Sequence, residues 1–176
     1  RMEGVAWSSR RQQDGGIDRV PLSDEVPGAL WLCGKHAIGP DHVRTIAETG
    51  AHATVVSLVE EHELVDRYPA YVAWLREHRG RRAVWWPVPD LHAPTLDATV
   101  ELVDDLVDRL RTGESLLMHC GAGIGRTGTM AVCVLLAFGA PLDDALRTVG
   151  ESRPMAGPEV GAQRELVEAF AARLTG

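Results

Sequence analysis

A glycine-rich segment that contains one cysteine and one arginine is the part of this sequence best suited to chemistry. Residues 119–129 read His-Cys-Gly-Ala-Gly-Ile-Gly-Arg-Thr-Gly-Thr, between an apolar run typical of a strand and one typical of a helix. Glycines let a backbone turn its N–H groups inward, and a helix N-terminus favours anions. Arg126 can donate two parallel hydrogen bonds to phosphate oxygens. We therefore predict a phosphate-binding loop made by Gly121, Ala122, Gly123, Ile124, Gly125 and Arg126.

Cys120 precedes this loop directly and is the candidate nucleophile. A free thiol is mostly protonated in neutral water, whereas the thiolate is the reactive form. A helix dipole contributes only about 0.3–1 kcal/mol to an adjacent anion, and about 2 kcal/mol at best. The loop amides, the Thr127 hydroxyl and Arg126 would have to supply the remaining stabilisation of a thiolate. His119, whose side chain points to the opposite face of the strand, is expected only to orient its surroundings.

A second candidate group lies thirty residues upstream, in a proline-rich segment. Cleavage of a phosphomonoester needs an acid to protonate the leaving oxygen. Asp90 follows Trp86-Pro87-Val88-Pro89 after a predicted strand, and it should therefore reach the same edge of the sheet as Cys120. The competing interpretation is that Asp90 merely caps a turn after two prolines.

The combination resembles a known signature. His119, Cys120, Gly123, Arg126 and Thr127 match the HCxxGxxR(S/T) pattern of the cysteine-dependent tyrosine and dual-specificity phosphatases. The resemblance runs from about Gly28 to Phe170 and is greatest to small atypical dual-specificity phosphatases, although GAGIGRTG is similar to the tyrosine-specific branch. It implies hydrolysis of phosphotyrosine, and of phosphoserine or phosphothreonine, in a phosphorylated protein or peptide. It also implies a cysteinyl-phosphate intermediate, Asp90 acting in both steps, and no cofactor.

Two further residues acquire roles only through this resemblance. Arg153-Pro154 followed by Gln163 is similar to the C-terminal helix of such phosphatases, where a glutamine faces the attacking water. Val56 to Glu60 is similar to the strand and loop near their site, so that Glu60 would contact Arg126 or the substrate. Without the resemblance, Gln163 is an ordinary exposed helix residue and Glu60 a solvated charge.

Several other functions share part of this pattern. A catalytically inactive phosphatase fold would only bind phosphopeptides, and a rhodanese-like sulfur transferase also uses a cysteine at a strand end. An inositol phosphate is a less favoured substrate, because residues 121–125 carry no charge. Residues 123–128 fit GxGxxG, but the 48 residues after them contain no strand pattern to complete a dinucleotide site. His62-Glu63 begins like HExxH, but the second histidine is absent, so no metal is expected.

The elements that position these residues alternate in type along the chain. Apolar runs at 28–33, 53–58, 83–88 and 115–119 predict strands, and helical spacing appears at 41–49, 64–78, 96–110, 127–138, 142–149 and 159–174. We expect an α/β fold with a mostly parallel central sheet, helices on both faces, and the phosphate loop between a strand and a helix. Residues 1–20 read as a flexible N-terminal tail, and 21–176 as a single phosphatase domain.

Composition limits the remaining possibilities. The chain has 176 residues, enough for one core, and a net charge of −7, which argues against general binding of nucleic acids. Three cysteines at unrelated spacings do not form a disulfide framework; Cys33 and Cys133 should pack in the core, with a redox partnership between Cys33 and Cys120 left open. Without an apolar run of membrane-spanning length or a signal peptide, we expect a cytoplasmic monomer that binds no membrane.

Overall fold

The structure is a computed structural model that describes residues 10–176. Its centre is a five-stranded sheet in the order β1-β2-β5-β3-β4. The strands are β1 (Asp18–Val20), β2 (Ala29–Gly34), β3 (Thr54–Ser57), β4 (Ala83–Trp85) and β5 (Ser115–Cys120). All pairings are parallel except that of β1 with β2. The predicted mostly parallel sheet is thereby confirmed.

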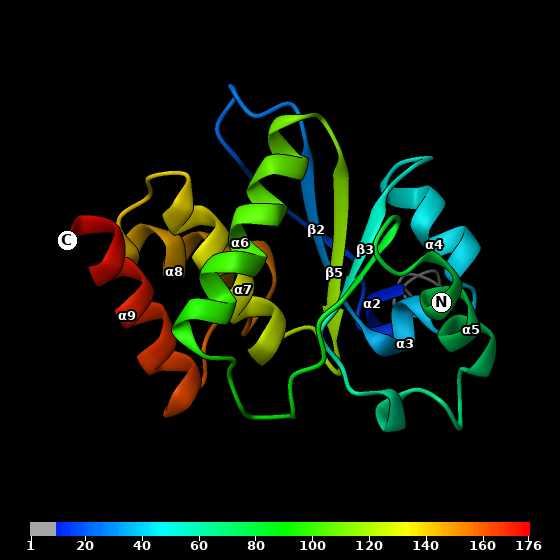
Figure 1. The fold of residues 1–176 in the computed structure, drawn as a ribbon. Helices are drawn as coiled ribbons and strands as arrows, with labels where there is room; N and C mark the ends of the chain where they lie inside the picture. Colours follow the sequence, from blue (N-terminus) through cyan, green and yellow to red (C-terminus); the bar gives the residue numbers. More distant parts are fainter. Residues whose placement is uncertain (1–9) are drawn as a thin grey trace, which may run out of the picture.

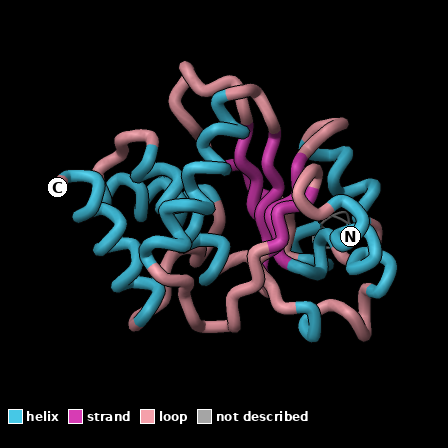
Figure 2. The backbone as a smooth tube through the Cα atoms, in the orientation of Figure 1, coloured by secondary structure: helices cyan, strands magenta, loops and turns pink. Residues whose placement is uncertain are grey.

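Helices cover both faces of this sheet, as predicted (Figures 1 and 2). One face carries α3 (Lys35–Ile38), α4 (His42–Thr49) and α5 (Pro69–His78), with the short α2 (Arg10–Asp14) and the 3-10 turn η1 (Glu61–Glu63) near its lower edge. The other face carries α6 (Leu96–Arg111), α7 (Gly125–Ala137), α8 (Leu142–Ser152) and α9 (Ala162–Thr175). Within residues 10–176, no helix combines the length and the apolar character needed to cross a bilayer.

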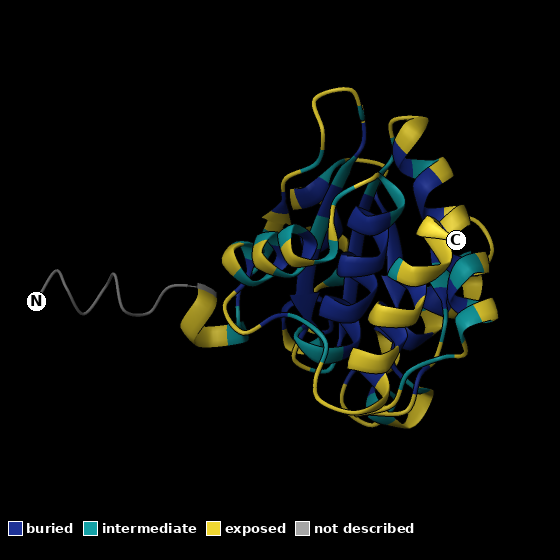
Figure 3. Ribbon diagram, turned by 90° about the vertical axis from the view of Figure 1, so that its left-hand side faces the viewer, coloured by how far each residue is buried: buried dark blue, intermediate teal, exposed yellow. Residues whose placement is uncertain are grey.

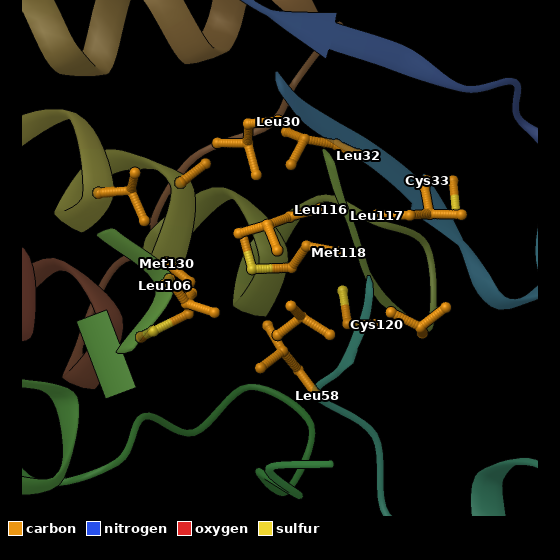
Figure 4. Packing of buried hydrophobic residues seen from close by; sticks show 14 of the residues in the cluster. Leu30, Leu32, Cys33, Leu58, Leu106, Leu116, Leu117, Met118, Cys120 and Met130 are labelled. Atoms are coloured by element: carbon orange, nitrogen blue, oxygen red, sulfur yellow. The ribbon is translucent and has the colours of Figure 1, made fainter. Parts of the chain in front are cut away.

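β5 lies at the centre of the sheet, with β2 on one side and β3 on the other. Because both faces of a central parallel strand are covered, its sequence is a continuous apolar run, Leu116-Leu117-Met118, rather than an alternating one. Figure 4 shows these residues packed with Leu30 and Leu32 of β2. In Figure 3 the buried strands form the dark interior of the molecule, and the outer faces of the helices are exposed. The rigid core thus holds the C-terminal end of β5 in place.

One helix and one strand are shorter in the structure than the sequence pattern indicates. Helical spacing begins at residue 64, with Pro69 predicted as either a helix start or a kink, and the structure starts α5 at Pro69. Proline suits the first turn, where a missing N–H has no cost. The strand expected to reach residue 88 ends at Trp85. After Trp85 the chain still runs beside β3 and the residue that follows it, but it is joined to them by isolated hydrogen bonds, from Trp86 N to Ser57 O and from Val88 N to Leu58 O.

The predicted flexible tail needs correction for its last part. Residues 1–9 lie outside the described residues, but α2 and β1 occupy much of the remainder. β1 pairs with β2 in antiparallel register, and its Val20 is only 1% exposed. A three-residue strand that contains Asp18 and Arg19 has too little periodicity to be detected in the sequence. The ordered domain therefore begins before residue 21.

Gly128 tests how tightly α7 is packed. A Cβ at this position would lie 2.1 Å from the backbone nitrogen of Gly157, so we expect Gly128→Ala to lower the free energy of unfolding by about 2 kcal/mol. Gly150 in α8 is the matched control, because its Cβ would meet Ala156 O at an ordinary 3.8 Å. There the same substitution should stabilise the helix by about 0.5–1 kcal/mol. Urea denaturation of both variants measures the difference, and equal effects would contradict the close approach of Gly128.

Candidate active site

The candidate site lies at the carboxyl end of the sheet, where β5 passes into α7. The loop of residues 121–124 connects Cys120, the last residue of β5, to Gly125, the first of α7. Gly123 has φ +76°, and a Cβ there would lie 2.2 Å from the Cys33 carbonyl oxygen. Only glycine fits this combination of a left-handed backbone and close contact with β2. The predicted position of the loop, between a strand and a helix, is confirmed.

The carbonyl oxygens of four consecutive loop residues are hydrogen-bonded to the protein around the loop. Gly121 O accepts from Lys35 N at 2.8 Å, and Ile124 O accepts from Gly128 N and Gly157 N at 2.9 and 3.2 Å. The oxygens between them, those of Ala122 and Gly123, accept from the Arg153 guanidinium at 2.8 and 2.9 Å.

The orientation of the loop amides follows from these bonds. In a planar trans peptide group the C=O and the next N–H point in opposite directions. The N–H groups of residues 122–125 are therefore turned away from the surrounding protein. In the part of the chain that the structure describes, the backbone N–H groups of residues 121–126 donate to no protein acceptor. Convergent free amides at a helix N-terminus form a concave anion-binding site.

Arg126 is held beside this loop by a carboxylate that the sequence analysis did not assign to the site. Nη1 and Nη2 of Arg126 each donate to one oxygen of Glu63 at 2.8 Å, and Nη1 also donates to Val88 O at 2.7 Å. Burial opposes the charge on Arg126, but the bonds to Glu63 together with the other acidic groups nearby raise the arginine pKa. Burial also disfavours ionised Glu63, yet the bonds from Arg126 and the Glu60 backbone, together with the charges of Arg126 and Lys35, lower its pKa overall. Both groups are therefore charged at neutral pH.

Glu60, the carboxylate expected to contact Arg126, instead organises the 3-10 turn η1. Its backbone N–H donates to Glu63 Oε2 at 2.9 Å in a reciprocal capping box, and its side chain bonds His62 at 2.8 Å. The expected contact of Glu60 with Arg126 is made by Glu63 instead, because η1 directs its third residue, rather than the N-cap residue Glu60, toward α7. A contact of Glu60 with the substrate stays a prediction. The only available signal in the sequence was an acidic cluster directly after the β3 strand.

Two side chains of η1 and that of its N-cap residue Glu60 also offer metal ligands. One ligand atom each from Glu60, His62 and Glu63 lies within 4.8 Å of the others. The Glu63 carboxylate, however, is already engaged by both Nη atoms of Arg126. A cation here would have to compete with that ion pair.

Asp90 lies at the mouth of the site. Its side chain is 73% exposed, and Oδ1 is 3.5 Å from Arg126 Nη2. Oδ1 also accepts from Leu91 N at 3.0 Å, and Leu91 has φ +67°, a strained conformation for a leucine. Val88, two residues earlier, is buried and contacts Arg126 through its carbonyl. The structure therefore brings Asp90 and Arg126 together, while the turn-capping bond to Leu91 N is present as well.

Gln163 is not an exposed helix residue. It is buried, and its Nε2 donates to His92 O in the Asp90 loop at 3.2 Å. Its Oε1 accepts from Thr129 of α7 and from Glu159 N, at 3.3 and 3.0 Å. The helix period had placed Gln163 on α9, but only the packing of α9 on α7 shows that it connects the Asp90 loop to the helix of Arg126.

Cys120 and Thr127 are buried beside the loop. Cys120 is 3% exposed, and all three cysteines are free thiols. Cys33 pairs in register with His119 rather than with Cys120, which directs its side chain to the opposite face of the sheet. The Thr127 hydroxyl, expected to support a thiolate, has no hydrogen-bond partner among the described residues. A buried hydroxyl of this kind can serve an incoming group.

His119 is held on the far face of β5. Its Nε2 shares a 2.6 Å hydrogen bond with the Tyr71 hydroxyl, and its Nδ1 lies 3.1 Å from Cys120 O. Burial lowers the His119 pKa from 6.5 to about 4, so the ring is neutral at neutral pH. The orienting role expected from the sequence stays a prediction, and these two hydrogen bonds are its structural basis.

Comparison with known proteins gives a consistent result. A family model described as "Swiss Army Knife protein, DSP-PTPase phosphatase domain" matches residues 25–169. Human dual specificity protein phosphatase 22 is 46% identical over 63 residues, which are 34% of this chain and 33% of that protein. Rat cyclin-dependent kinase inhibitor 3 is 30% identical over 73 residues, or 42% and 31% of the two chains. The match thus spans about a third of the length of these curated relatives.

Solved structures share the fold over nearly the whole chain. Tk-PTP in the active form has a TM-score of 0.64 and 27% identity, and the match covers 86% of this chain and 99% of that one. Kinase associated phosphatase has a TM-score of 0.68 and 17% identity, with 92% and 96% covered.

The ion pair between Glu63 and Arg126 leads to a stability prediction. Glu63→Gln leaves a buried guanidinium without its countercharge, so we expect the free energy of unfolding at pH 7 to fall by about 3 kcal/mol. Glu60→Gln, three residues away, is the control and should cost less than about 1 kcal/mol. Urea denaturation measures both values. Equal losses would mean that Glu63 has no special role in holding Arg126.

The neutral state of His119 leads to a pH prediction. Because its folded pKa is below the unfolded value, its contribution to stability is present above pH 6.5 and is lost as the pH falls toward about 4. We expect the free energy of unfolding to drop by about 2 kcal/mol more in the wild type than in His119→Asn between pH 7 and pH 4.5. Glu63, whose pKa is lowered from 4.5, loses its contribution only below this window. Parallel pH profiles for the two proteins would contradict a neutral buried His119.

Proposed function

The chain belongs to the DSP-PTPase phosphatase domain family, and from that premise we propose that it hydrolyses phosphomonoesters of proteins through a cysteinyl-phosphate intermediate. The observation that carries the proposal is the orientation of the phosphate loop. Four of its carbonyls are bonded outward, so four amides face inward beside the Cys120 sulfur and Arg126. Such an array of donors fits the oxygens of a phosphoryl group.

In the first proposed step the Cys120 thiolate attacks phosphorus. The loop amides and the Arg126 guanidinium bind the non-bridging oxygens, and a sulfur–phosphorus bond forms as the ester phosphorus–oxygen bond breaks. Asp90 donates a proton to the leaving oxygen, which departs as an alcohol or phenol. The exposed position of Asp90, 3.5 Å from Arg126, supports this role, because a carboxyl group there is open to an incoming ester.

In the second step water attacks the phosphorus of the cysteinyl phosphate. The Asp90 carboxylate accepts a proton from this water, the sulfur–phosphorus bond breaks, and inorganic phosphate is released with Cys120 restored as a thiolate. Gln163 supports the step indirectly, since its bond to His92 O ties the Asp90 loop to α7. The role proposed for Gln163 is therefore positioning of the acid loop, rather than contact with the attacking water.

A phosphorylated protein or peptide fits the surroundings of the site best. Five large apolar side chains are exposed among the described residues, and three of them, Leu91, Met155 and Val160, lie on the loops of Asp90 and of residues 153–161. Residues 121–125 carry no charge that would select a polyphosphorylated headgroup. Apolar rims favour the aromatic ring of phosphotyrosine, although the small phosphoserine and phosphothreonine esters would also reach the loop. An inositol phosphate is the alternative substrate.

The free thiols support a reducing compartment. Cys33, Cys120 and Cys133 are all buried and form no disulfide, as is usual in cytosolic proteins. Burial raises the pKa of Cys133 to about 12, so that this thiol is inert. We place the protein in the cytoplasm, acting as a monomer on phosphorylated proteins.

Two variants test the activity together. The wild type should hydrolyse p-nitrophenyl phosphate and phosphotyrosine peptides, and Cys120→Ser should abolish turnover while the fold is retained. Asp90→Asn should lower kcat about 100-fold or more on alkyl phosphates, but much less on p-nitrophenyl phosphate, whose leaving group needs little protonation. Equal losses on both esters would contradict Asp90 as the acid. Binding of phosphopeptide by the wild type without turnover would indicate a binding module instead.

A further inference from the structure

Arg153 makes an unusual set of contacts for a residue outside the signature. It follows α8, is only 4% exposed, and uses all three guanidinium nitrogens. Nε and Nη2 donate to Gly123 O and Ala122 O at 2.9 and 2.8 Å. Nη1 donates to Gly15 O and Gly16 O, both at 3.1 Å, and to Asp18 Oδ2 at 2.8 Å. One side chain thus joins the phosphate loop to the segment before β1.

The two loop carbonyls that Arg153 binds belong to peptide groups whose N–H ends face the site. The carbonyl of Ala122 shares its peptide plane with Gly123 N–H, and that of Gly123 shares its plane with Ile124 N–H. Gly123 is the residue at which rotation of these planes is sterically cheapest. Without the guanidinium, either plane could rotate and present a carbonyl oxygen to an incoming oxyanion.

The N-terminal segment is shaped to hold Arg153. Gly15 and Gly16 have φ of +84° and +75°, and their consecutive carbonyls both reach Nη1. Asp14 accepts from Gly16 N at 2.9 Å, which closes the turn. Asp18 is the first residue of β1, so its carboxylate is fixed by the pairing of β1 with β2.

Direct packing contributes little to this connection. A cavity of about 420 Å³ lies between the segment and the phosphate loop, and is lined by Arg11, Gly15, Ala122 and Arg153 among others. Because this space is open, the segment acts on the loop chiefly through the guanidinium. Asp18 is also the only carboxylate that Arg153 contacts among the described residues.

We infer that Arg153 is a positioning residue, which couples the N-terminal segment Gly15–Asp18 to the phosphate loop and keeps the Gly123 and Ile124 amides directed at the phosphoryl group. The expected effect of Arg153 on catalysis rests on the proposed function, whereas its expected effect on anion binding does not. The segment that reads as a tail in the sequence is then part of the phosphate-binding apparatus.

The experiment compares Arg153→Met with Arg109→Met. Arg109 is the matched control, because its side chain is largely buried and donates both to a carbonyl, that of Arg81, and to a carboxylate, that of Glu114. Glu114 directly precedes β5, so these contacts lie at the end of β5 opposite to Cys120. Both variants should have a lower Tm. At a temperature where both are folded, Arg153→Met should bind inorganic vanadate at least 10-fold more weakly and lose about 100-fold in kcat/KM, the effect of one lost or misdirected oxyanion donor. Arg109→Met should match the wild type in both.

Two further variants separate positioning from bulk stability. Arg153→Lys keeps the charge but cannot span both loop carbonyls and Asp18, so it should resemble Arg153→Met. Asp18→Asn removes the charge partner that Arg153 shares with Arg11 but leaves the bonds from Arg153 to the loop carbonyls, so it should show a smaller loss in the same direction. Vanadate affinity in the folded Arg153 variants equal to that of Arg109→Met would overturn the inference. If the wild type binds vanadate in this manner but turns over no ester, the proposed function fails while the positioning role stands.

Discussion

The site depends on one constraint: the four consecutive carbonyls of the phosphate loop, residues 121–124, are hydrogen-bonded to the surrounding protein and point away from the anion site. A loop of small residues has many conformations, and in most of them some carbonyl oxygens would face a bound anion and repel it. The bonds from Lys35, Arg153, Gly128 and Gly157 to the carbonyls of residues 121–124 select one in which residues 122–125 expose their N–H groups instead. The glycines permit this geometry, but the surrounding protein enforces it.

Arg126 connects this loop to the other parts of the site. Its guanidinium touches Glu63 after β3, Val88 after β4, and Asp90 at the mouth, although the residue itself belongs to α7. Gln163 adds a second connection, between the Asp90 loop and α7. A shift of any one loop would therefore be transmitted to the guanidinium. Charged groups inside proteins need such partners, because an unpaired one is strongly disfavoured.

The fold supplies rigidity at the point where the chemistry is proposed to occur. β5 is buried on both faces and has a neighbour on each side, so the position of Cys120 is determined by the core. His119, neutral and hydrogen-bonded to Tyr71, fixes the opposite face of the same strand without placing a charge there. The sulfur proposed as the nucleophile and the loop beside it are thus built on a neutral, closely packed support.

The sequence alone determined the features that depend on local spacing: the loop between a strand and a helix, the pairing of Cys120 with Arg126, the acid candidate Asp90, and the alternation that produces a parallel sheet. It could not determine which distant residues complete the site. Glu63 rather than Glu60 reaches Arg126 because of the phase of a 3-10 turn, and Gln163 is buried because α9 packs on α7. Arg153 meets Gly15, Gly16 and Asp18 across more than 130 residues. Periodicity constrains neighbours along the chain, whereas such contacts arise only when the elements pack together.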